Sequence, residues 1–594
     1  MRVDLLIALN KCDLSHLTLE VSELNVRDAG NLYGFLRKCL GAVLFLTCSI
    51  CCLGQTSNLT TKQVKSLLTL GELWGFLKYY HPNVAQGKWD WDSVLISKIP
   101  LFLKANDKQT LSLLTKSWLL ELGEVDECST CDVNKPVSTC YNLDFTWVNE
   151  QTFSKDIISK IDYIGANRRK GLRYYVEYAS PRNTVNFVHE KVYNTAAFLF
   201  PNAQYRLLLL FRYWNIVNYF SPYKYLNGRD WRKVLEEEIP AFYGARDTLE
   251  YQLEYVRLIN SLNDGHSMIH GGVLERFLGK YYTVPFLCML IDNQFVVSSI
   301  LNDSAAAVIR IRKGDVIKEV NGEDVFRRFK RLKPYVISSN IDNKAMTFAA
   351  SFLFRGTDSL FAVKKERHNK VIFDTIQLSQ QTLVEVVPGD AWKILKDSIG
   401  YVDMGALKKE QVHDMMQELM PTKGIIFDIR NYPNNTWSVI VNFLSKKPFI
   451  MSKVTYPDLD YPGLFLYHKP IIYGKENKES YTGKVVLLVN ESSVSHAEYS
   501  AMGLQAACSA VTIGNTTAGK DGDINNRFWL PGGYISRFSG LGIYYPDGTV
   551  TQRKGIKIDI KARPSIRGLQ EGRDELIERA LTYFHSINKT PAGN

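Results

Sequence analysis

The segment Asn490-Glu-Ser-Ser-Val-Ser495-His-Ala-Glu498 brings a serine hydroxyl to a place where it can act as a nucleophile. It follows the apolar run 484–489, which predicts a buried strand, and it precedes 499–507, which predicts a helix. A hydroxyl at such a turn is exposed at the carboxyl edge of a sheet, where the free N–H groups of the helix N-terminus can stabilise an oxyanion. Ser495 could therefore carry out acyl transfer; a serine that only caps the helix is the common alternative.

The C-terminal part of the chain must supply the sheet that positions this serine. From Ser398 onward, strand-like runs at 400–404, 424–429 and 484–489 alternate with helix-like segments. The run Gly424-Ile-Ile-Phe-Asp-Ile429 is apolar apart from Asp428, as in a strand that is buried on both faces. This alternation predicts a parallel or mixed sheet with crossover helices.

Between about Val284 and Leu378 the pattern changes to short β-like runs. Gln294–Ile300 is followed by the alanine-rich 304–308 and then by Lys313-Gly-Asp-Val-Ile-Lys-Glu-Val-Asn-Gly322. Two turn-forming pairs, Gly-Asp and Asn-Gly, flank a strand in this last segment. The pattern resembles a PDZ domain, a module that captures peptide termini by adding a strand to a sheet edge. A generic small β domain is the alternative interpretation.

The first half of the chain matches itself at an offset of 140 residues without a gap. The matched pairs include Trp74/Trp214, Tyr79/Tyr219, Pro82/Pro222, Asp90-Trp91/Asp230-Trp231, Ile99-Pro100/Ile239-Pro240 and Asp107/Asp247. One repetition indicates a duplicated unit, and apolar residues at i, i+3 and i+4 predict that each copy is helical. The copies differ at their ends, because the second carries Asn263-Asp-Gly-His266-Ser267 and the first has Asp126 in the position of His266.

Composition bounds the function without specifying it. The 594 residues suffice for three to five domains at roughly 100–200 residues each, and the mean hydropathy of −0.15 excludes a polytopic membrane protein. The net charge of +11 is scattered along the chain and not gathered in a stripe or arm. It therefore predicts no nucleic-acid partner.

The N-terminus resembles a secretory leader. Arg37-Lys38 precedes an apolar stretch that ends at Gly54, and this stretch is shorter than the about 20 residues of a membrane-spanning helix. We expect a signal peptide within 1–54, with 1–34 explained by a start codon placed too early. The mature protein would then be periplasmic, envelope-associated or secreted. Lipidation at Cys51 or Cys52 and an uncleaved anchor are the alternatives.

Five cysteines remain after this leader. Cys128, Cys131 and Cys140 form a group that could be half a zinc site or a redox motif, but no fourth ligand lies nearby in the sequence. In an exported chain a local disulfide is the better interpretation. Cys288 and Cys508 lie in apolar runs and are expected to be buried thiols.

Several motifs together resemble the tail-specific (C-terminal processing) serine protease family. Besides the segment around Ser495 and the PDZ-like module, they are Lys423-Gly-Ile-Ile-Phe-Asp-Ile-Arg-Asn-Tyr-Pro433, Ile513-Gly-Asn-Thr-Thr-Ala-Gly-Lys520, Leu530-Pro-Gly-Gly533, Tyr545-Pro-Asp-Gly548, Gly555-Ile-x-x-Asp559 and Gly572-Arg-Asp574. The resemblance covers about residues 205–585 and implies a ClpP/crotonase-like peptidase domain. It assigns the nucleophile to Ser495, with Glu498 behind it, and an oxyanion hole to backbone N–H groups at Ser495–His496 and around Tyr432.

The same resemblance offers two activating partners for Ser495. Members with a Ser–Lys dyad place the lysine where Lys520 stands, and a buried lysine with a lowered pKa can act as a neutral base. Tricorn-protease-like members use a histidine from an upstream domain, which here is His266. We favour His266, because the architecture resembles the tricorn-like branch and an imidazole needs little tuning. His496 is ranked last, because the side chains of adjacent residues diverge.

Two departures from the family pattern bear on activity. Tricorn-like enzymes carry a glutamate that orients the histidine, and this chain has Gln552 there, which could hold an imidazole but not stabilise its charged form. Asn434-Asn435 replaces the usual Gly-Gly after the Asp-x-Arg-Asn-x-Pro motif. A catalytically inactive peptide- or ligand-binding protein on the same fold is therefore the second hypothesis. A carbohydrate-active protein is a third, but it lacks a convincing carboxylate pair.

The sequence thus predicts a multidomain α+β protein and an exported serine-type endopeptidase that needs no metal or cofactor. The predicted divisions are a leader (1–54), two helical repeat units (55–185 and 186–278), a PDZ-like domain (279–390) and a ClpP/crotonase-like α/β peptidase domain (391–590). The expected partner is a protein or peptide substrate, with envelope association possible and the oligomeric state open.

Overall fold

The computed structural model describes residues 59–131, 142–179, 181–269, 272–380 and 389–589. The predicted leader and Cys140 lie outside these residues, which all belong to one unit, Ser57–Asn594. In the described part of the chain, no helix combines the length and the apolar character needed to cross a bilayer.

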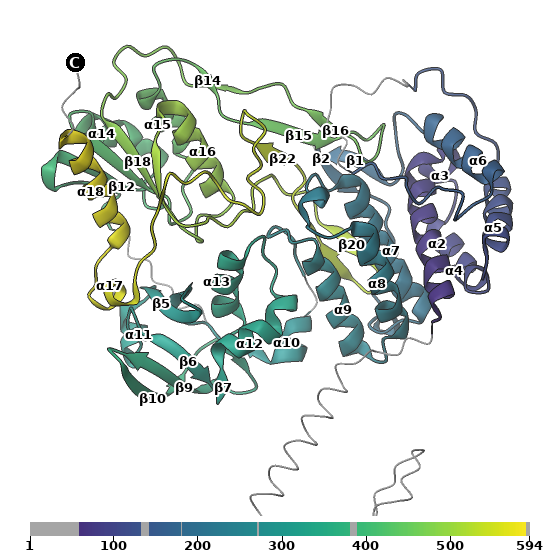
Figure 1. Ribbon diagram of the computed structural model, residues 1–594, viewed down its shortest axis with the longest axis horizontal. Coiled ribbons are helices and arrows are strands. Elements are labelled where there is room, and N and C mark those ends of the chain that lie inside the picture. Colours follow the sequence, from purple (N-terminus) through teal and green to yellow (C-terminus); the bar gives the residue numbers. More distant parts are fainter. Residues whose placement is uncertain (1–58, 132–141, 180, 270–271, 381–388, 590–594) are drawn as a thin grey trace, which may run out of the picture. The chain divides into compact units, whose positions relative to one another are not determined.

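Helices dominate the first part of the unit (Figure 1). They are α2 (Thr61–Tyr80), α3 (Pro82–Ala85), α4 (Trp91–Phe102), α5 (Lys108–Glu121), α6 (Lys155–Ala166), α7 (Ala203–Phe220), α8 (Trp231–Gly244), α9 (Thr248–Ser261) and α10 (Val273–Leu278). A small hairpin, β1 (Val176–Ala179) and β2 (Thr184–Phe187), precedes α7. The prediction that this region is helical is confirmed, and α7 ends just before Pro222.

Equivalent residues of the two matched segments make equivalent contacts. Trp74 Nε1 donates to Trp91 O at 3.0 Å and Trp91 Nε1 donates back to Trp74 O at 3.1 Å. Trp214 and Trp231 make the same reciprocal pair at 2.7 and 3.1 Å. In both segments the aspartate before the second tryptophan is the N-cap of a helix. The matched sequence therefore corresponds to matched local structure.

The middle of the chain is a mainly antiparallel sheet with three helices. The strand order is β10-β9-β6-β5-β4, with β7 paired to β6, so that β4 and β10 are edge strands. The elements are β4 (Phe286–Ile291), β5 (Gln294–Ile300), α11 (Asp303–Val308), β6 (Val316–Val320), β7 (Glu323–Asp324), α12 (Val325–Leu332), α13 (Ile341–Ser351), β9 (Leu360–Arg367) and β10 (Lys370–Gln377).

The C-terminal part contains the predicted sheet, in the order β11-β12-β13-β18-β19-β23. All neighbouring pairs are parallel except β11 and β12. The strands are β11 (Trp392–Leu395), β12 (Ile399–Asp403), β13 (Gly424–Asp428), β18 (Lys484–Val489), β19 (Val511–Gly514) and β23 (Ile560–Lys561). Adjacent residues of β13 enter different cores, because strand side chains alternate between faces: Ile425 packs with α14 (Val412–Leu419), α15 (Trp437–Leu444) and α16 (His496–Cys508), whereas Ile426 packs with α18 (Glu575–Lys589).

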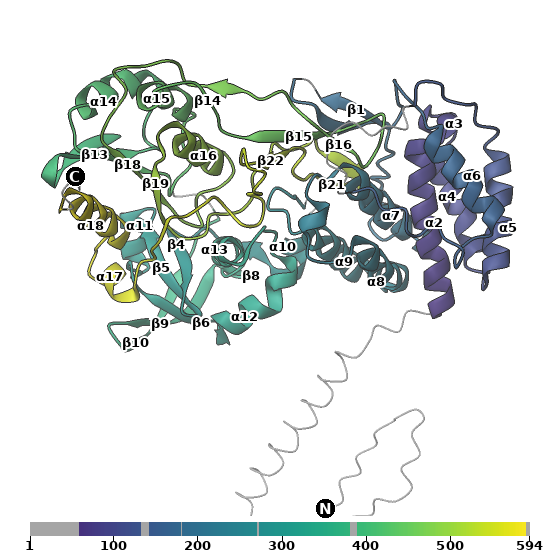
Figure 2. The same ribbon diagram turned by 45° about the horizontal axis from the view of Figure 1, so that its top comes forward.

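A short hairpin of the C-terminal part packs on the second helical segment (Figure 2). It consists of β20 (Phe528–Leu530) and β21 (Tyr534–Ser536). The Tyr534 ring stacks on Tyr255 of α9 at 4.7 Å, and its hydroxyl accepts from Gln252 at 2.9 Å. This contact brings residues 537–539 beside the turn that follows α9, and that turn carries His266.

The cysteines follow the sequence analysis closely. Cys128 and Cys131 form a disulfide, which confirms the predicted local bridge for these two residues. Cys288 is buried, as predicted, whereas Cys508 is half-buried at the end of α16.

Candidate active site

Ser495 stands at a sharp turn between β18 and α16. It is the N-cap of α16 and has φ 52° and ψ −108°, a backbone conformation that is unfavourable for a residue with a Cβ. The strain is held by neighbouring contacts, since the Ser493 hydroxyl donates to Ile429 O at 2.6 Å and Ala518 N donates to Ser493 O at 3.0 Å. With this backbone conformation Ser495 continues neither the strand before it nor the helix after it. A sharp strand-to-helix turn of this kind is what a nucleophile elbow requires.

Glu498 fixes the elbow from inside the protein. Its side chain is fully buried and accepts from Ser495 N at 3.1 Å, Thr517 Oγ1 at 2.5 Å, Gly519 N at 2.8 Å and Lys520 N at 3.0 Å. Burial raises the pKa of Glu498, while these four donors oppose that shift. Glu498 therefore ties the turn of Ser495 to the 517–520 loop.

His266 lies against Ser495, although 229 residues separate the two in sequence. The distance from His266 Nε2 to Ser495 Oγ is 3.1 Å. The histidine follows α9 in a turn where Asp264 accepts from the His266 backbone N–H at 2.9 Å. A side chain from the helical region thus reaches the serine of the C-terminal sheet.

A second serine contacts the other ring nitrogen of the imidazole. Ser539 Oγ lies 2.9 Å from His266 Nδ1, and the same hydroxyl donates to Asp264 Oδ1 at 3.0 Å. The Ser539 backbone N–H also donates to Asp264 Oδ2 at 2.7 Å. Because the Ser539 proton goes to the carboxylate, the hydroxyl must accept from Nδ1–H, which leaves the Nε2 lone pair directed at Ser495.

The surroundings keep this imidazole neutral. Burial lowers the pKa of His266 to about 4, Asp264 opposes the shift, and the positive charges of Lys520 and Arg537 add to it. At neutral pH the histidine is therefore unprotonated and able to accept a proton from Ser495.

Lys520 lies beside the His266 turn but makes no hydrogen bond to Ser495 in the described residues. Its carbon chain fills the space next to Gly265, where an added Cβ would come within 2.7 Å of Lys520 Cδ. Burial lowers the pKa of Lys520, and Glu498 and Asp264 oppose this shift. Of the two bases that the sequence offered, the structure brings His266 into contact with Ser495 and leaves Lys520 as a neighbouring charge.

His496 and Tyr432 line the expected oxyanion region. Among the described residues the His496 backbone N–H has no hydrogen-bond acceptor, as expected for the first residue of a helix. The Tyr432 side chain is 62% exposed and its ring lies 6.1 Å from that of His496. Burial lowers the pKa of the His496 imidazole, and no contact to Ser495 Oγ supports His496 as a base.

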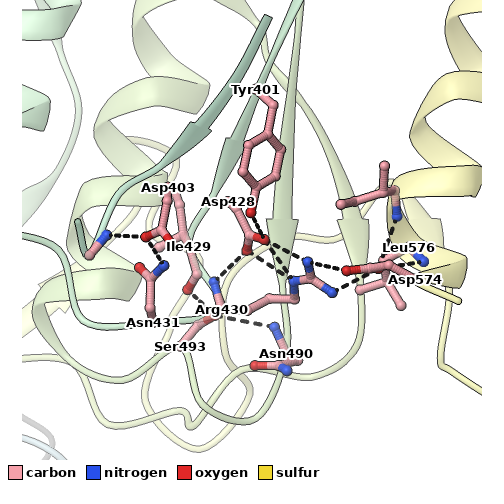
Figure 3. A network of polar contacts seen from close by, with 12 residues as sticks. Tyr401, Asp403, Asp428, Ile429, Arg430, Asn431, Asn490, Ser493, Asp574 and Leu576 are labelled. Atoms are coloured by element: carbon pink, nitrogen blue, oxygen red, sulfur yellow. Dashed lines mark hydrogen bonds and ion pairs between the residues drawn. The ribbon is translucent and has the colours of Figure 1, made fainter. Parts of the chain in front are cut away.

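A partly buried ionic network anchors the loop that carries Tyr432 (Figure 3). Arg430 pairs with Asp428 at the end of β13 and with Asp574 before α18, at 2.5 and 2.8 Å. Tyr401 of β12 donates to the same Asp428 at 2.9 Å. Because Arg430 is followed directly by Asn431 and Tyr432, these contacts fix the start of the loop relative to the sheet.

The asparagines that replace Gly-Gly are compatible with this loop. Asn434 Nδ2 donates to Gly405 O at 2.8 Å and to Leu407 O at 3.2 Å, and Asn435 adopts φ 57°. Asparagine tolerates positive φ better than most residues, so the second position needs no glycine. The Asn431 side chain adds a further tie, from Nδ2 to Asp403 Oδ1 at 2.7 Å.

Gln552 does not hold the imidazole, contrary to the role considered for it. Its Oε1 accepts from Asp521 N at 3.1 Å, and its Nε2 is buried without a hydrogen-bond partner in the described residues. Ser539 and Asp264 occupy the orienting position instead. Sequence reasoning missed Ser539 because nothing in 536–540 marks a catalytic role, whereas Asp264 stands in the quoted Asn-Asp-Gly-His motif. In the described residues no cluster of three His, Cys, Asp or Glu side chains is arranged to hold a metal.

Comparisons with known proteins identify a family domain in the C-terminal part of the chain. The model of peptidase family S41 matches residues 398–562. No curated protein matches the chain significantly. Among solved structures, a serine-to-alanine variant of CPAF aligns with 66% of this chain and 99% of its own at 13% identity and a TM-score of 0.51. Mature CPAF covers 65% and 99% at 13% identity and a TM-score of 0.50, and the tricorn protease covers 65% and 37% at 16% identity and 0.33. The CPAF likeness extends over about two thirds of the chain and concerns its fold.

Proposed function

The chain carries a peptidase family S41 domain, which makes it a serine-type peptidase, and on that premise we propose that it cleaves peptide bonds with Ser495 as nucleophile and His266 as base. The observation that carries this proposal is the 3.1 Å separation between His266 Nε2 and Ser495 Oγ. Substrates of this class are proteins or peptides.

In the proposed reaction His266 takes the proton of Ser495 as the oxygen attacks the scissile carbonyl. The proton then passes from Nε2 to the leaving amine, and a water molecule hydrolyses the acyl-enzyme by the same steps. Asp264 acts through Ser539, which accepts from Nδ1–H and so stabilises the imidazolium that forms. A buried carboxylate two hydrogen bonds away can do this without touching the substrate.

The oxyanion would bind at the N-terminus of α16. The unpaired His496 N–H and the helix dipole supply one donor, and the backbone near Tyr432 is the expected second. The Arg430 network would keep that second donor in place, because it clamps the preceding residues to the sheet.

We also propose roles and origins for the regions that precede the peptidase domain. The 279–390 domain is PDZ-like and recruits peptide segments; its edge strand β4 and the order of β4, β5, α11 and β6 support this. The two helical segments arose by duplication, and their reciprocal tryptophan pairs support that history. Only the second copy kept a histidine for catalysis.

We further propose that the protein is exported. The leader-like N-terminus motivates it, and the Cys128–Cys131 disulfide supports it, since such bridges persist in oxidising compartments. Periplasmic, envelope-attached and secreted locations fit these observations equally.

Labelling with a fluorophosphonate probe tests the catalytic assignment. The wild type should be labelled at Ser495, Ser495→Ala should not, and His266→Ala should label at least 100-fold more slowly. Equal labelling of wild type and Ser495→Ala would refute the nucleophile. Loss of labelling in Lys520→Ala with full labelling in His266→Ala would move the base to Lys520. An unlabelled wild type that still binds peptides would support the alternative, an inactive peptide-binding protein, for which Gln552 remains the sequence argument.

A further inference from the structure

The residues that lead into α13 lie between the two sides of the proposed active site. Ser339 Oγ accepts from Gly265 N at 2.7 Å, and Gly265 directly precedes His266. The next residue, Asn340, donates from Nδ2 to Thr517 O at 2.7 Å. Asn340 has an extended backbone, in which successive side chains point in opposite directions. Two adjacent residues of the domain that contains β4 to β10 thus hold the turn of the base and a loop beside the nucleophile.

The contact on the base side is close. A Cβ added to Gly265 would lie 3.0 Å from Ser339 Oγ, so a glycine allows this approach. Ser339 itself is buried. The end of α9 is held by the same domain, since Asn260 donates to Pro334 O at 2.9 Å and accepts from Lys344 Nζ at 3.0 Å. The turn that follows α9 is therefore fixed from the side of α13.

The contacts on the nucleophile side reach the support of Ser495. Thr517 is fully buried, and its hydroxyl donates at 2.5 Å to Glu498, the carboxylate that also accepts from Ser495 N. Asn343, in the first turn of α13, donates from Nδ2 to Glu491 O at 3.0 Å. Glu491 lies in the loop between β18 and Ser495. Side chains from the start of α13 therefore contact segments before and after the elbow.

The side-chain amide of Asn340 is engaged at both of its polar atoms. Its Oδ1 accepts from Asn343 N at 3.1 Å, which makes Asn340 the N-cap of α13, and its Nδ2 is the donor to Thr517 O. The cap orients the amide, so the position of the 517–520 loop is tied to the helix. A displacement of about 1 Å between reacting groups can reduce a rate by about 100-fold. Contacts that fix both sides of the site to one helix can therefore determine its activity.

We propose that Ser339 and Asn340 are positioning residues that set the distance between His266 Nε2 and Ser495 Oγ. This inference rests on the proposed function, in which that pair starts the reaction. Ser339 holds the turn of His266, and Asn340 holds the 517–520 loop beside Ser495. Each residue fixes only one side, so the loss of either contact frees the histidine and the serine to move apart.

Kinetics of two conservative variants test this role. Ser339→Ala removes the acceptor of Gly265 N, and Asn340→Ser keeps a capping oxygen but is too short to reach Thr517 O. Each should lower kcat by about tenfold or more and leave KM within about twofold, because the pair is misaligned while the substrate contacts are unchanged. The double variant should lose less than the product of the two single losses, because either change alone already releases the pair.

Two matched variants of the same domain serve as controls. Asn302→Ser changes the N-cap of α11, and Ser298→Ala removes a hydroxyl that donates to Leu287 O at 3.3 Å. Both should keep kcat within about twofold of the wild type. Urea unfolding of every variant shows whether the protein is folded under the assay conditions.

Hydrogen exchange measured by mass spectrometry gives a readout that needs no turnover. Ser339→Ala should speed the exchange of peptides from residues 263–267 by about tenfold or more, because Gly265 N loses its acceptor. Asn340→Ser should do the same for peptides from residues 515–520, whose carbonyl at Thr517 loses its donor. Each variant should leave the other segment unchanged, so each is a control for the other.

These readouts separate the positioning role from the proposed function. The expected exchange pattern in a protein whose wild type cleaves nothing would support the positioning role and refute only the hydrolysis. An active wild type with unchanged kcat in Ser339→Ala or Asn340→Ser would overturn the positioning role while hydrolysis stands. A raised KM with unchanged kcat would assign the two residues to substrate binding, and single losses that multiply in the double variant would make them independent. Either of these results overturns the proposal.

Discussion

Ser539 Oγ lies 2.9 Å from His266 Nδ1 and donates its own hydrogen bond to Asp264, so the hydroxyl sets the tautomer of the imidazole. The carboxylate that stabilises the charged histidine is thus one hydroxyl removed from the ring. Glutamine at 552 leaves this arrangement intact, because it bonds to Asp521 N and not to the imidazole.

Ser539→Ala should lower kcat by about 10- to 100-fold with little change in KM, because the Nδ1 proton loses its acceptor and the tautomer is no longer fixed. Steady-state kinetics measures this. Ser536→Ala is the matched control, since Ser536 is buried three residues earlier and its hydroxyl has no hydrogen-bond partner in the described residues. Equal losses in both variants would show that repacking, not tautomer control, is responsible.

The pH profile should show the environment of His266. Because burial lowers the pKa of His266 to about 4, kcat/KM should rise through an acid limb near pH 4 and stay level through neutrality. Lys520→Met removes a positive charge that disfavours the imidazolium, so the acid limb should move to higher pH. An unchanged limb would contradict the electrostatic coupling, and abolition of activity at every pH would identify Lys520 as the base.

Glu498→Gln should destabilise the protein by about 2–4 kcal/mol and slow labelling of Ser495, because an amide NH₂ would face donors that now meet a carboxylate. Urea unfolding and fluorophosphonate labelling report the two effects. Glu491→Gln is the control, since Glu491 is also buried nearby but its Oε2 has no hydrogen-bond partner among the described residues. Similar losses of stability in the two variants would count against a special role for Glu498.

Asp521 should make the protein less stable as the pH rises. Burial raises its pKa from 3.8 to about 8, so the unfolded chain loses the proton near pH 4 while the folded protein keeps it until about pH 8. Stability from this group is present below pH 4 and declines up to about pH 8. Asp521→Asn mimics the protonated form and should gain stability over wild type between pH 5 and 8, on the order of 2 kcal/mol.

Denaturant unfolding at several pH values measures this difference. Asp414→Asn on the exposed face of α14 serves as the comparison and should show a constant offset. A stability difference between Asp521→Asn and wild type that does not change with pH would show that Asp521 is ionised in the folded protein.

Arg430→Lys should lower kcat by about tenfold or more and destabilise the protein by about 2–4 kcal/mol, because an ammonium cannot bridge Asp428 and Asp574 as the guanidinium does (Figure 3). Kinetics and unfolding of Arg430→Lys, Asp574→Asn and the double variant give the coupling energy between these two residues. Additive effects would mean that the two residues do not act together on the loop.

The sequence predicted best the features that depend on neighbours in the chain. The apolar run 484–489 and the helix after Ser495 are local patterns, so the strand, the turn and the helix could be read directly. The supporting role of Glu498, three residues from Ser495, came from the family resemblance. The long-range contact of His266 with Ser495 came from a family resemblance, because periodicity carries no information about which distant segments meet.

The part that could not be predicted is the orientation of His266. Ser539 reaches it through long-range contacts, among them the packing of Tyr534 of the β20–β21 hairpin against α9 and the hydrogen bonds of Ser539 to Asp264. Nothing in the sequence distinguishes Tyr534 or Ser539 from other residues of their kind. Gln552 was considered as a holder of the imidazole because it stands in the place of the family's glutamate, but its Oε1 accepts from Asp521 N instead, a contact that the sequence does not indicate.

In the proposed mechanism the base comes from the turn after α9 and the nucleophile from the elbow before α16, so the 398–562 segment holds only one member of the proposed pair. That mechanism requires the contact between the two segments, which includes the Tyr534 ring on Tyr255 and the Gln252 hydrogen bond to the Tyr534 hydroxyl, and none of these three residues is proposed to be catalytic. A change at that contact would switch turnover off while leaving the serine, its strained turn and its oxyanion donor intact. On this mechanism the helical region supplies the base to the peptidase domain within one chain, and a fragment that lacks the helical region would contain Ser495 but not His266.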